Sequence, residues 1–159
     1  MSKNSDMGIR FYMVECDSKG KVPTEAVEKD LERDFDGLLY SKAEGLDAVG
    51  KPRVYSEKYS DSDRLRVYLP ANITHDATTV DFTFFFIGED KQEVYHNFLQ
   101  YVCKGFHRYY DNFRKKYLYF FVNSEVKPAE EKHFGSTPYL KLDLTVQNIF
   151  GQTFDEAIK

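Results

Sequence analysis

The stretch TVDFTFFFIGEDKQEVYHNFLQYV, residues 79–102, contains two hydrophobic periods joined by a short polar turn. Its first part, residues 79–87, alternates between two faces, and one face carries only large apolar side chains: Val80, Phe82, Phe84 and Phe86. A period of two residues is typical of a β-strand. The opposite face also becomes apolar toward its end, at Phe85 and Ile87, so we predict a central strand that is covered on both faces.

The second part of the stretch predicts a helix over residues 90–104. Asp90 and Glu93 have the spacing of a capping box, and Gly105 is a typical helix stop. The apolar residues recur at helical spacing and form one stripe: Val94, Tyr95, Phe98, Leu99, Val102 and Cys103. Because such a stripe must pack on something apolar, we expect it to cover the sheet that contains residues 79–87.

Alternation and turn residues predict the remaining elements. Strands are expected at residues 8–16, 37–43, 53–59, 64–69, 116–123 and 139–148, and a short helix at 24–35. Residues 64–69 should be half-buried, and 139–148 should have one wet face. The polar segment 124–138 is expected to be a connector.

These elements predict an α+β fold, a mostly antiparallel β-sandwich or rolled sheet with one principal helix packed on it. A chain of 159 residues is the usual size of one domain, and its aromatic fraction of 16% suits a β-rich core. We expect a single β-rich domain over residues 8–150, a disordered N-terminus over 1–7 and a C-terminal tail over 151–159.

Net charge and hydropathy exclude several classes of partner. The formal net charge is −4, so no global field draws the chain to nucleic acid or to an anionic membrane. No apolar run has the length of a membrane span, and the N-terminus lacks the apolar core of a signal peptide, so a soluble, cytoplasmic protein is expected. Cys16 and Cys103 have no metal or redox spacing and are predicted to be buried free thiols.

The sequence contains no convincing catalytic constellation. The four histidines lack the spacing of a zinc pair, and Asp34-Phe35-Asp36 and Asp61-Ser62-Asp63 are interpreted as solvated turns. No nucleophile elbow, phosphate-binding glycine loop or dinucleotide fingerprint is present. We therefore expect no enzyme activity, catalytic residue, metal or cofactor. Residues 106–117 mix aromatic and basic side chains, and a hairpin start is favoured over a single-stranded nucleic-acid site there because the chain is acidic.

The segment 44–63 is the candidate functional region. Loops of this length without structure are uncommon in compact domains and are usually functional or disordered. Tyr55 and Tyr59 give it anchor side chains typical of interfaces. We predict that Tyr55, Tyr59, Asp61 and Asp63 belong to an assembly interface, and that an exposed sheet edge provides a second contact surface for another copy of the chain.

Four segments carry a resemblance in layout to tail structural proteins of phages and prophages, the group of tail-tube and distal-tail folds. They are DFDGLLYSK at 34–42, YSDSDRLRVY at 59–68, the strand-to-helix run 82–102, and GSTPY at 135–139. The resemblance covers residues 34–150. It implies a β-sandwich or rolled sheet flanked by a helix, which stacks as rings, often hexameric, in a DNA-conducting tail. It also implies a long loop that contacts the next ring, other tail proteins as partners, and a final location in the virion tail.

Two other classes of function stay open. A small-ligand-binding or regulatory β-rich module would need a concave pocket within the aromatic core. An enzyme would need ionisable groups that converge in one cleft with perturbed pKa values.

Overall fold

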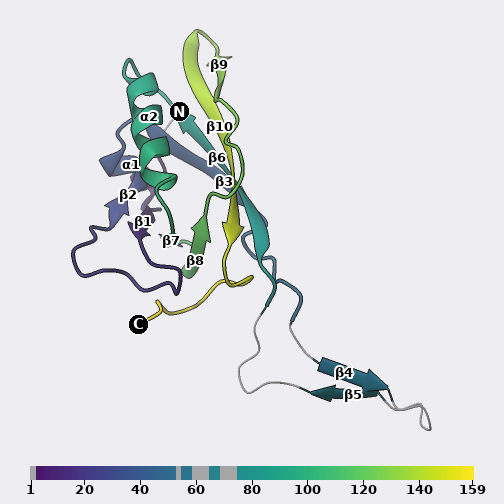
Figure 1. Ribbon diagram of the computed structural model, residues 1–159. Coiled ribbons are helices and arrows are strands. Elements are labelled where there is room, and N and C mark those ends of the chain that lie inside the picture. The colour runs from purple at the N-terminus through teal and green to yellow at the C-terminus, as the bar shows by residue number, and fades with distance from the viewer. Residues whose placement is uncertain (1–2, 53–54, 59–64, 69–74) are drawn as a thin grey trace.

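The computed structural model describes residues 3–52, 55–58, 65–68 and 75–159 and has an α+β fold (Figure 1). An eight-stranded antiparallel sheet has the order β2-β1-β7-β8-β10-β6-β3, with β9 paired to β10, and β4 and β5 form a separate two-stranded sheet. In chain order the elements are η1 (Asn4–Met7), β1 (Phe11–Glu15), β2 (Lys29–Asp30), α1 (Leu31–Asp34), β3 (Leu38–Glu44), β4 (Tyr55–Lys58), β5 (Leu65–Tyr68), β6 (Thr78–Phe86), α2 (Lys91–Val102), β7 (His107–Asp111), β8 (Lys116–Phe121), β9 (Glu130–Phe134) and β10 (Thr137–Asn148).

The ladder between β6 and β10 is the centre of the sheet. It runs from the pair Leu140↔Phe86 to the pair Asn148↔Thr78, and β3 pairs with the other side of β6, so the predicted central position of β6 is confirmed. On its inner face Val80, Phe82, Phe84 and Phe86 are all fully buried. Its outer face is not covered throughout as predicted, because Asp81 is exposed there and accepts a hydrogen bond from Thr145 across the ladder at 2.6 Å.

The sheet rolls over so that its two halves face each other. β8 and β10 share only the pairs Gln147↔Phe121 and Asn148↔Phe120, and the sheet bends at this narrow joint. Aromatic rings from the two halves then meet in the core: Phe11 stacks on Tyr40 at 3.9 Å between centroids, and Phe82 lies 5.2 Å from Tyr109. This confirms the predicted rolled sheet.

Helix α2 packs on this core with the predicted stripe. Phe98 is fully buried, with its ring centroid 4.9 Å from that of Phe84 and 5.4 Å from that of Phe35. Tyr101, which the stripe did not include, is also buried. Two details of the prediction are wrong: Asp90 makes no side-chain cap hydrogen bond, and Cys103 is exposed just after the end of the helix.

The N-terminal region differs from the predictions of a disordered 1–7 segment and a helix over 24–35. Residues 4–7 form the 3₁₀ helix η1, and helix α1 begins only at Leu31. The helical period of 24–35 was misleading because Val27 is 74% exposed and supplies no buried face. Glu32 is buried and accepts hydrogen bonds from the Asn4 side chain and the Ser5 backbone, which hold η1 in place.

Four strands were assigned wrongly or missed. Residues 65–68 form a strand as predicted, but β5 pairs with β4 and not with the main sheet; whether its side chains are half-buried lies outside the described residues. β2, β7 and β9 were not assigned as strands, and β2 lies within the helix that was expected over 24–35. β9 lies within the expected connector 124–138, and all of its residues are exposed, so no buried alternation marked it as a strand.

The C-terminal segment is not a loose tail over its described length. Phe154 forms an isolated β-bridge with Tyr117, and the backbone N–H of Ile158 donates to the Tyr119 hydroxyl at 2.7 Å. The rings of Phe150 and Phe154 pack edge-on against Tyr119, which is fully buried. The segment therefore covers a stretch of β8 that β10 does not reach.

Candidate functional site

Strands β4 and β5 form a β-hairpin, which we call the β-hairpin arm; β4 lies within the predicted assembly loop 44–63, and β5 follows it. These strands pair from Tyr55↔Tyr68 to Lys58↔Leu65. Figure 1 shows the arm set apart from the eight-stranded sheet, at the opposite end of the molecule from the β9–β10 hairpin. Of the four predicted interface residues, Tyr55 lies on β4, whereas Tyr59, Asp61 and Asp63 lie outside the described residues.

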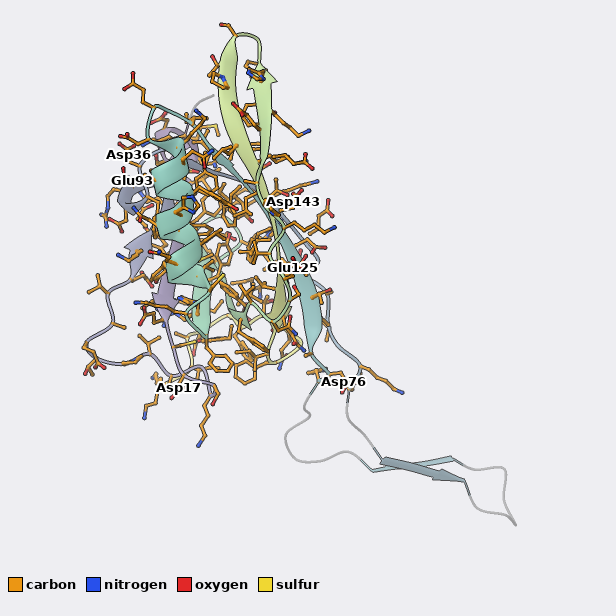
Figure 2. All side chains as sticks on the ribbon, turned by 45° about the horizontal axis from the view of Figure 1, so that its top comes forward. Asp17, Asp36, Asp76, Glu93, Glu125 and Asp143 are labelled. Carbon is orange, nitrogen blue, oxygen red and sulfur yellow. The ribbon has the colours of Figure 1, made fainter. Side chains whose placement is uncertain are left out.

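The arm joins the body at a closely packed base. Pro52 and His75 form an isolated antiparallel bridge, and the Asp76 backbone N–H donates to the Lys51 carbonyl at 2.9 Å. The Gly50 N–H donates to the Gly151 carbonyl at 2.7 Å, so the C-terminal segment also contributes to the base. Figure 2 labels Asp76 at this junction.

Two glycines allow this close approach. A Cβ atom on Gly50 would lie 1.7 Å from the Asp76 carbonyl oxygen, and one on Gly151 would lie 1.9 Å from the same atom. Gly151 also has a φ of +64°, which side-chain-bearing residues rarely adopt. Close backbone contacts therefore bring Gly50, Asp76 and Gly151 together at the base.

The sheet ends in two edge strands, β2 and β3. β2 pairs with β1 through only two residue pairs. β9 pairs with β10 on one side only among the described strands, and Phe134 near its tip is 69% exposed. Edge strands present unpaired backbone donors and acceptors, which is the property that strand addition requires.

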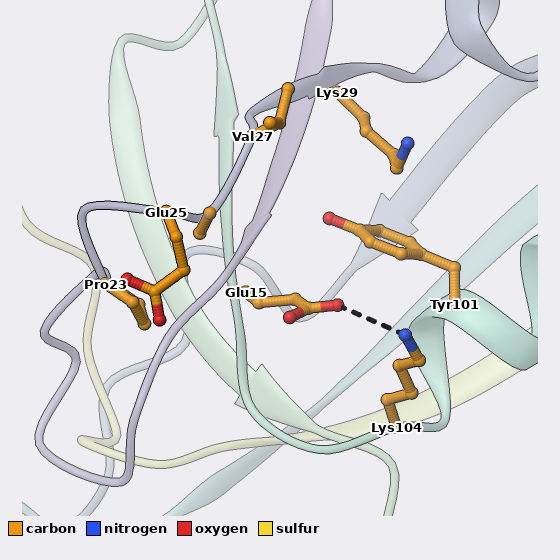
Figure 3. Close-up of a pocket in the computed structure, with 8 residues that line it drawn as sticks. Glu15, Pro23, Glu25, Val27, Lys29, Tyr101 and Lys104 are labelled. Carbon is orange, nitrogen blue, oxygen red and sulfur yellow. Dashed lines mark ion pairs between the residues drawn. The ribbon is translucent and has the colours of Figure 1, made fainter.

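A cavity of about 290 Å³ lies between β1, the 23–29 segment and the end of α2 (Figure 3). The Glu15 carboxylate lies 3.7 Å from the Lys104 ammonium, and the Tyr101 hydroxyl donates to the Met13 carbonyl at 3.2 Å. The Lys29 ammonium lies 5.5 Å from the Tyr101 ring centroid. Burial raises the pKa of Tyr101, so its phenol stays protonated. Glu15 and Lys104 already interact with each other, as do Lys29 and Tyr101, and the cavity lies outside the aromatic core that a ligand-binding module was expected to use.

Cys16 and His107 both line a smaller cavity of about 130 Å³, so a potential nucleophile and a potential base belong to one site. Burial raises the pKa of Cys16 to about 11, so the reactive thiolate is not formed at neutral pH. The His107 Nδ1 lies 3.1 Å from the Gly105 carbonyl and must be the protonated nitrogen, while Nε2 is buried without a hydrogen-bond partner among the described atoms. This arrangement does not activate the cysteine.

The buried His107 should make the protein sensitive to acid. Burial lowers its pKa below the ordinary value of 6.5, so on acidification the unfolded chain binds a proton before the folded chain does. Its stabilising contribution is therefore present above pH 6.5 and is lost as the pH falls through the folded-state pKa. We expect the free energy of unfolding to fall less from about pH 7 to about pH 5 in His107→Phe than in the wild type, as measured by urea titration at each pH. The control His133→Gln, at an exposed position, should lose as much stability on acidification as the wild type. If His107→Phe also loses as much as the wild type, His107 is not the source of the acid sensitivity.

Carboxylates gather in a third cavity of about 270 Å³, whose lining includes Asp34, Asp36, Asp90 and Glu93. Asp36 and Glu93 are labelled close together in Figure 2. Lys3 pairs with Asp36 at 2.9 Å, and Arg33 pairs with Asp34 at 3.3 Å. Within the described part of the chain, no group of three or more His, Cys, Asp or Glu side chains is arranged to hold a metal ion.

The basic and aromatic segment 106–117 forms β7 and the start of β8, which confirms the hairpin interpretation. Tyr109 is fully buried. Arg108 pairs with Glu28 at 2.9 Å and lies over the Tyr117 ring at 5.1 Å. Its guanidinium therefore already has partners within the chain.

No family model matches this chain, and no curated protein is significantly similar to it. Over the residues that the structure covers, no helix has the length and hydropathy needed to cross a membrane.

Proposed function

We propose that this chain is a structural subunit that works by self-association into rings, as part of a phage or prophage tail, and not by catalysis. The observation that carries the proposal is the β-hairpin arm, which stands apart from the body on a closely packed base. Among the described strands, β4 and β5 pair with each other and not with the main sheet, which suits them to contact a neighbouring copy or ring.

The sheet edges support the same proposal. β2 and β3 are different strands at opposite ends of the strand order, so an edge-to-edge contact between copies would be heterologous. Heterologous contacts produce closed rings when the rotation between subunits closes, and open filaments when it does not. The rolled sheet with one covering helix is the architecture that the resemblance to tail proteins implies.

Charge is compatible with a passage for DNA. A net charge of −4 avoids a tight electrostatic grip on a phosphate backbone. In two of the described cavities Glu15 pairs with Lys104, and burial keeps Tyr101 and Cys16 protonated, which favours a non-catalytic role over an enzyme.

The proposal is tested by light scattering and electron microscopy of the purified full-length chain across a concentration series. We expect rings or stacked rings whose fraction increases with protein concentration. A protein that remains strictly monomeric at the highest concentration, with or without neighbouring tail proteins, would contradict the proposal. Stoichiometric recovery of a small molecule from the 290 Å³ cavity would instead favour a ligand-binding module.

A further inference from the structure

The backbone of Tyr40, on the edge strand β3, is bonded to side chains rather than to another strand. The Tyr40 N–H donates to Oε2 of Glu32 at 3.2 Å, and the Tyr40 carbonyl accepts from the Asn4 side-chain amide at 2.8 Å. Since β6 occupies the other side of β3, these two bonds lie where an added strand would have to pair.

Asn4 and Glu32 also hold each other. The Asn4 amide donates to the same Oε2 of Glu32 at 2.7 Å, and the Ser5 backbone N–H donates to Oε1 at 3.3 Å. Glu32 is only 2% exposed, so its carboxylate depends on these donors in place of water. We call Asn4 and Glu32 the edge guard.

Asn4 of the guard lies on a short segment, whereas Glu32 lies on α1. Residues 3–7 contain η1, whose residues are not fully buried, and the Lys3 ammonium lies 2.9 Å from Asp36 and 3.4 Å from the Glu32 carbonyl. The strand is also irregular here, because its register against β6 shifts between Tyr40 and Lys42. Beyond the shift, Lys42 and Glu44 are exposed and pair with each other across the surface at 2.8 Å.

We propose that the edge guard is an autoinhibitory contact: it occupies the β3 edge at Tyr40 and restrains strand addition by a second copy of this chain until the segment 3–7 moves away. This inference rests on the proposed function, since it concerns when the same sheet edge becomes available. A free subunit with a guarded edge is protected from uncontrolled pairing, which edge strands otherwise invite. The incoming partner is an extended segment of a neighbouring copy, which would replace the two side-chain bonds of Tyr40 with backbone bonds.

The test compares wild type, Asn4→Ala, a chain that begins at Gly8, and the control Asp6→Ala. Asp6 is in the same short helix and is exposed, and no described side chain contacts its carboxylate. Two measurements are made: hydrogen exchange of the Tyr40 amide in dilute protein, and the concentration at which assembly begins, followed by light scattering.

We expect faster exchange at Tyr40 and an assembly threshold lowered about tenfold in Asn4→Ala and in the truncated chain, because the hydrogen bond from the Asn4 amide to the Tyr40 carbonyl and the Asn4 contact that holds Glu32 are lost. Asp6→Ala should match the wild type in both measurements. If wild type and all variants assemble at one threshold, the guard is refuted while the proposed function stands. If none of them assembles, the proposed function and this inference fail together.

Discussion

Phe98→Ala is expected to lower the free energy of unfolding by about 3 to 5 kcal/mol. Phe98 is fully buried and is the residue through which α2 enters the core, with its ring against Phe84, Phe86 and Phe35. Truncation removes the transfer free energy of the ring and leaves a cavity among aromatic side chains, which cannot easily collapse to fill it. Urea denaturation followed by circular dichroism measures the change as a shift in the midpoint.

Phe113→Ala is the matched control for this substitution, since it removes the same ring from a position that is 74% exposed. Its effect on the free energy of unfolding should stay within about 0.5 kcal/mol. A loss below about 1 kcal/mol in Phe98→Ala would contradict the burial of this ring in the aromatic core.

Local periodicity was sufficient to predict the centre of the fold. Phe82, Phe84 and Phe86 recur with the period of a strand, while Tyr95, Phe98 and Val102 recur with that of a helix. Both sets are fully or almost fully buried in the structure. Such patterns are informative because one face of each element has to be removed from water.

Periodicity does not specify which strands pair. Leu65 and Val67 alternate as in a strand of the main sheet, yet β5 pairs with β4 in the arm. Nothing in a short alternating segment encodes its partner, since the same pattern suits either sheet. β9 was missed for the opposite reason: it is held only by backbone pairing with β10, and none of its side chains is buried.

The candidate surfaces were predictable only in part. The length of the segment after β3 indicated a functional region, and Tyr55 does lie in the arm. The base of the arm could not be found from sequence, because Gly50 and Gly151 are far apart in the chain and only the fold brings them together beside the Asp76 carbonyl. The edge guard was equally hidden, since Asn4 and Glu32 resemble ordinary surface residues until the fold brings both to Tyr40.

Removing the β-hairpin arm is expected to abolish higher-order assembly while leaving the body folded. The chain departs at Pro52 and returns at His75, and these residues already form an antiparallel bridge. Replacing residues 53–74 with Asn-Gly would close this bridge as a two-residue hairpin, the connection that such a pair favours. The contacts of Gly50 and Gly151 at the base would then be kept, so the variant tests the arm and not its attachment.

The arm-less variant should have an unfolding midpoint close to that of the wild type, because the fully buried side chains of β6, β10 and α2 are all retained. Its assembly is the informative measurement. If the arm joins successive rings, electron microscopy should show at most single rings, held together by the edges of β2 and β3, where the wild type forms stacks. A variant with a scrambled sequence at residues 53–74 controls for length, and it should also fail to stack. Stacks of normal length in the arm-less variant would assign the contact between rings to another surface, of which the exposed β9–β10 hairpin at the opposite end of the molecule is the first to examine.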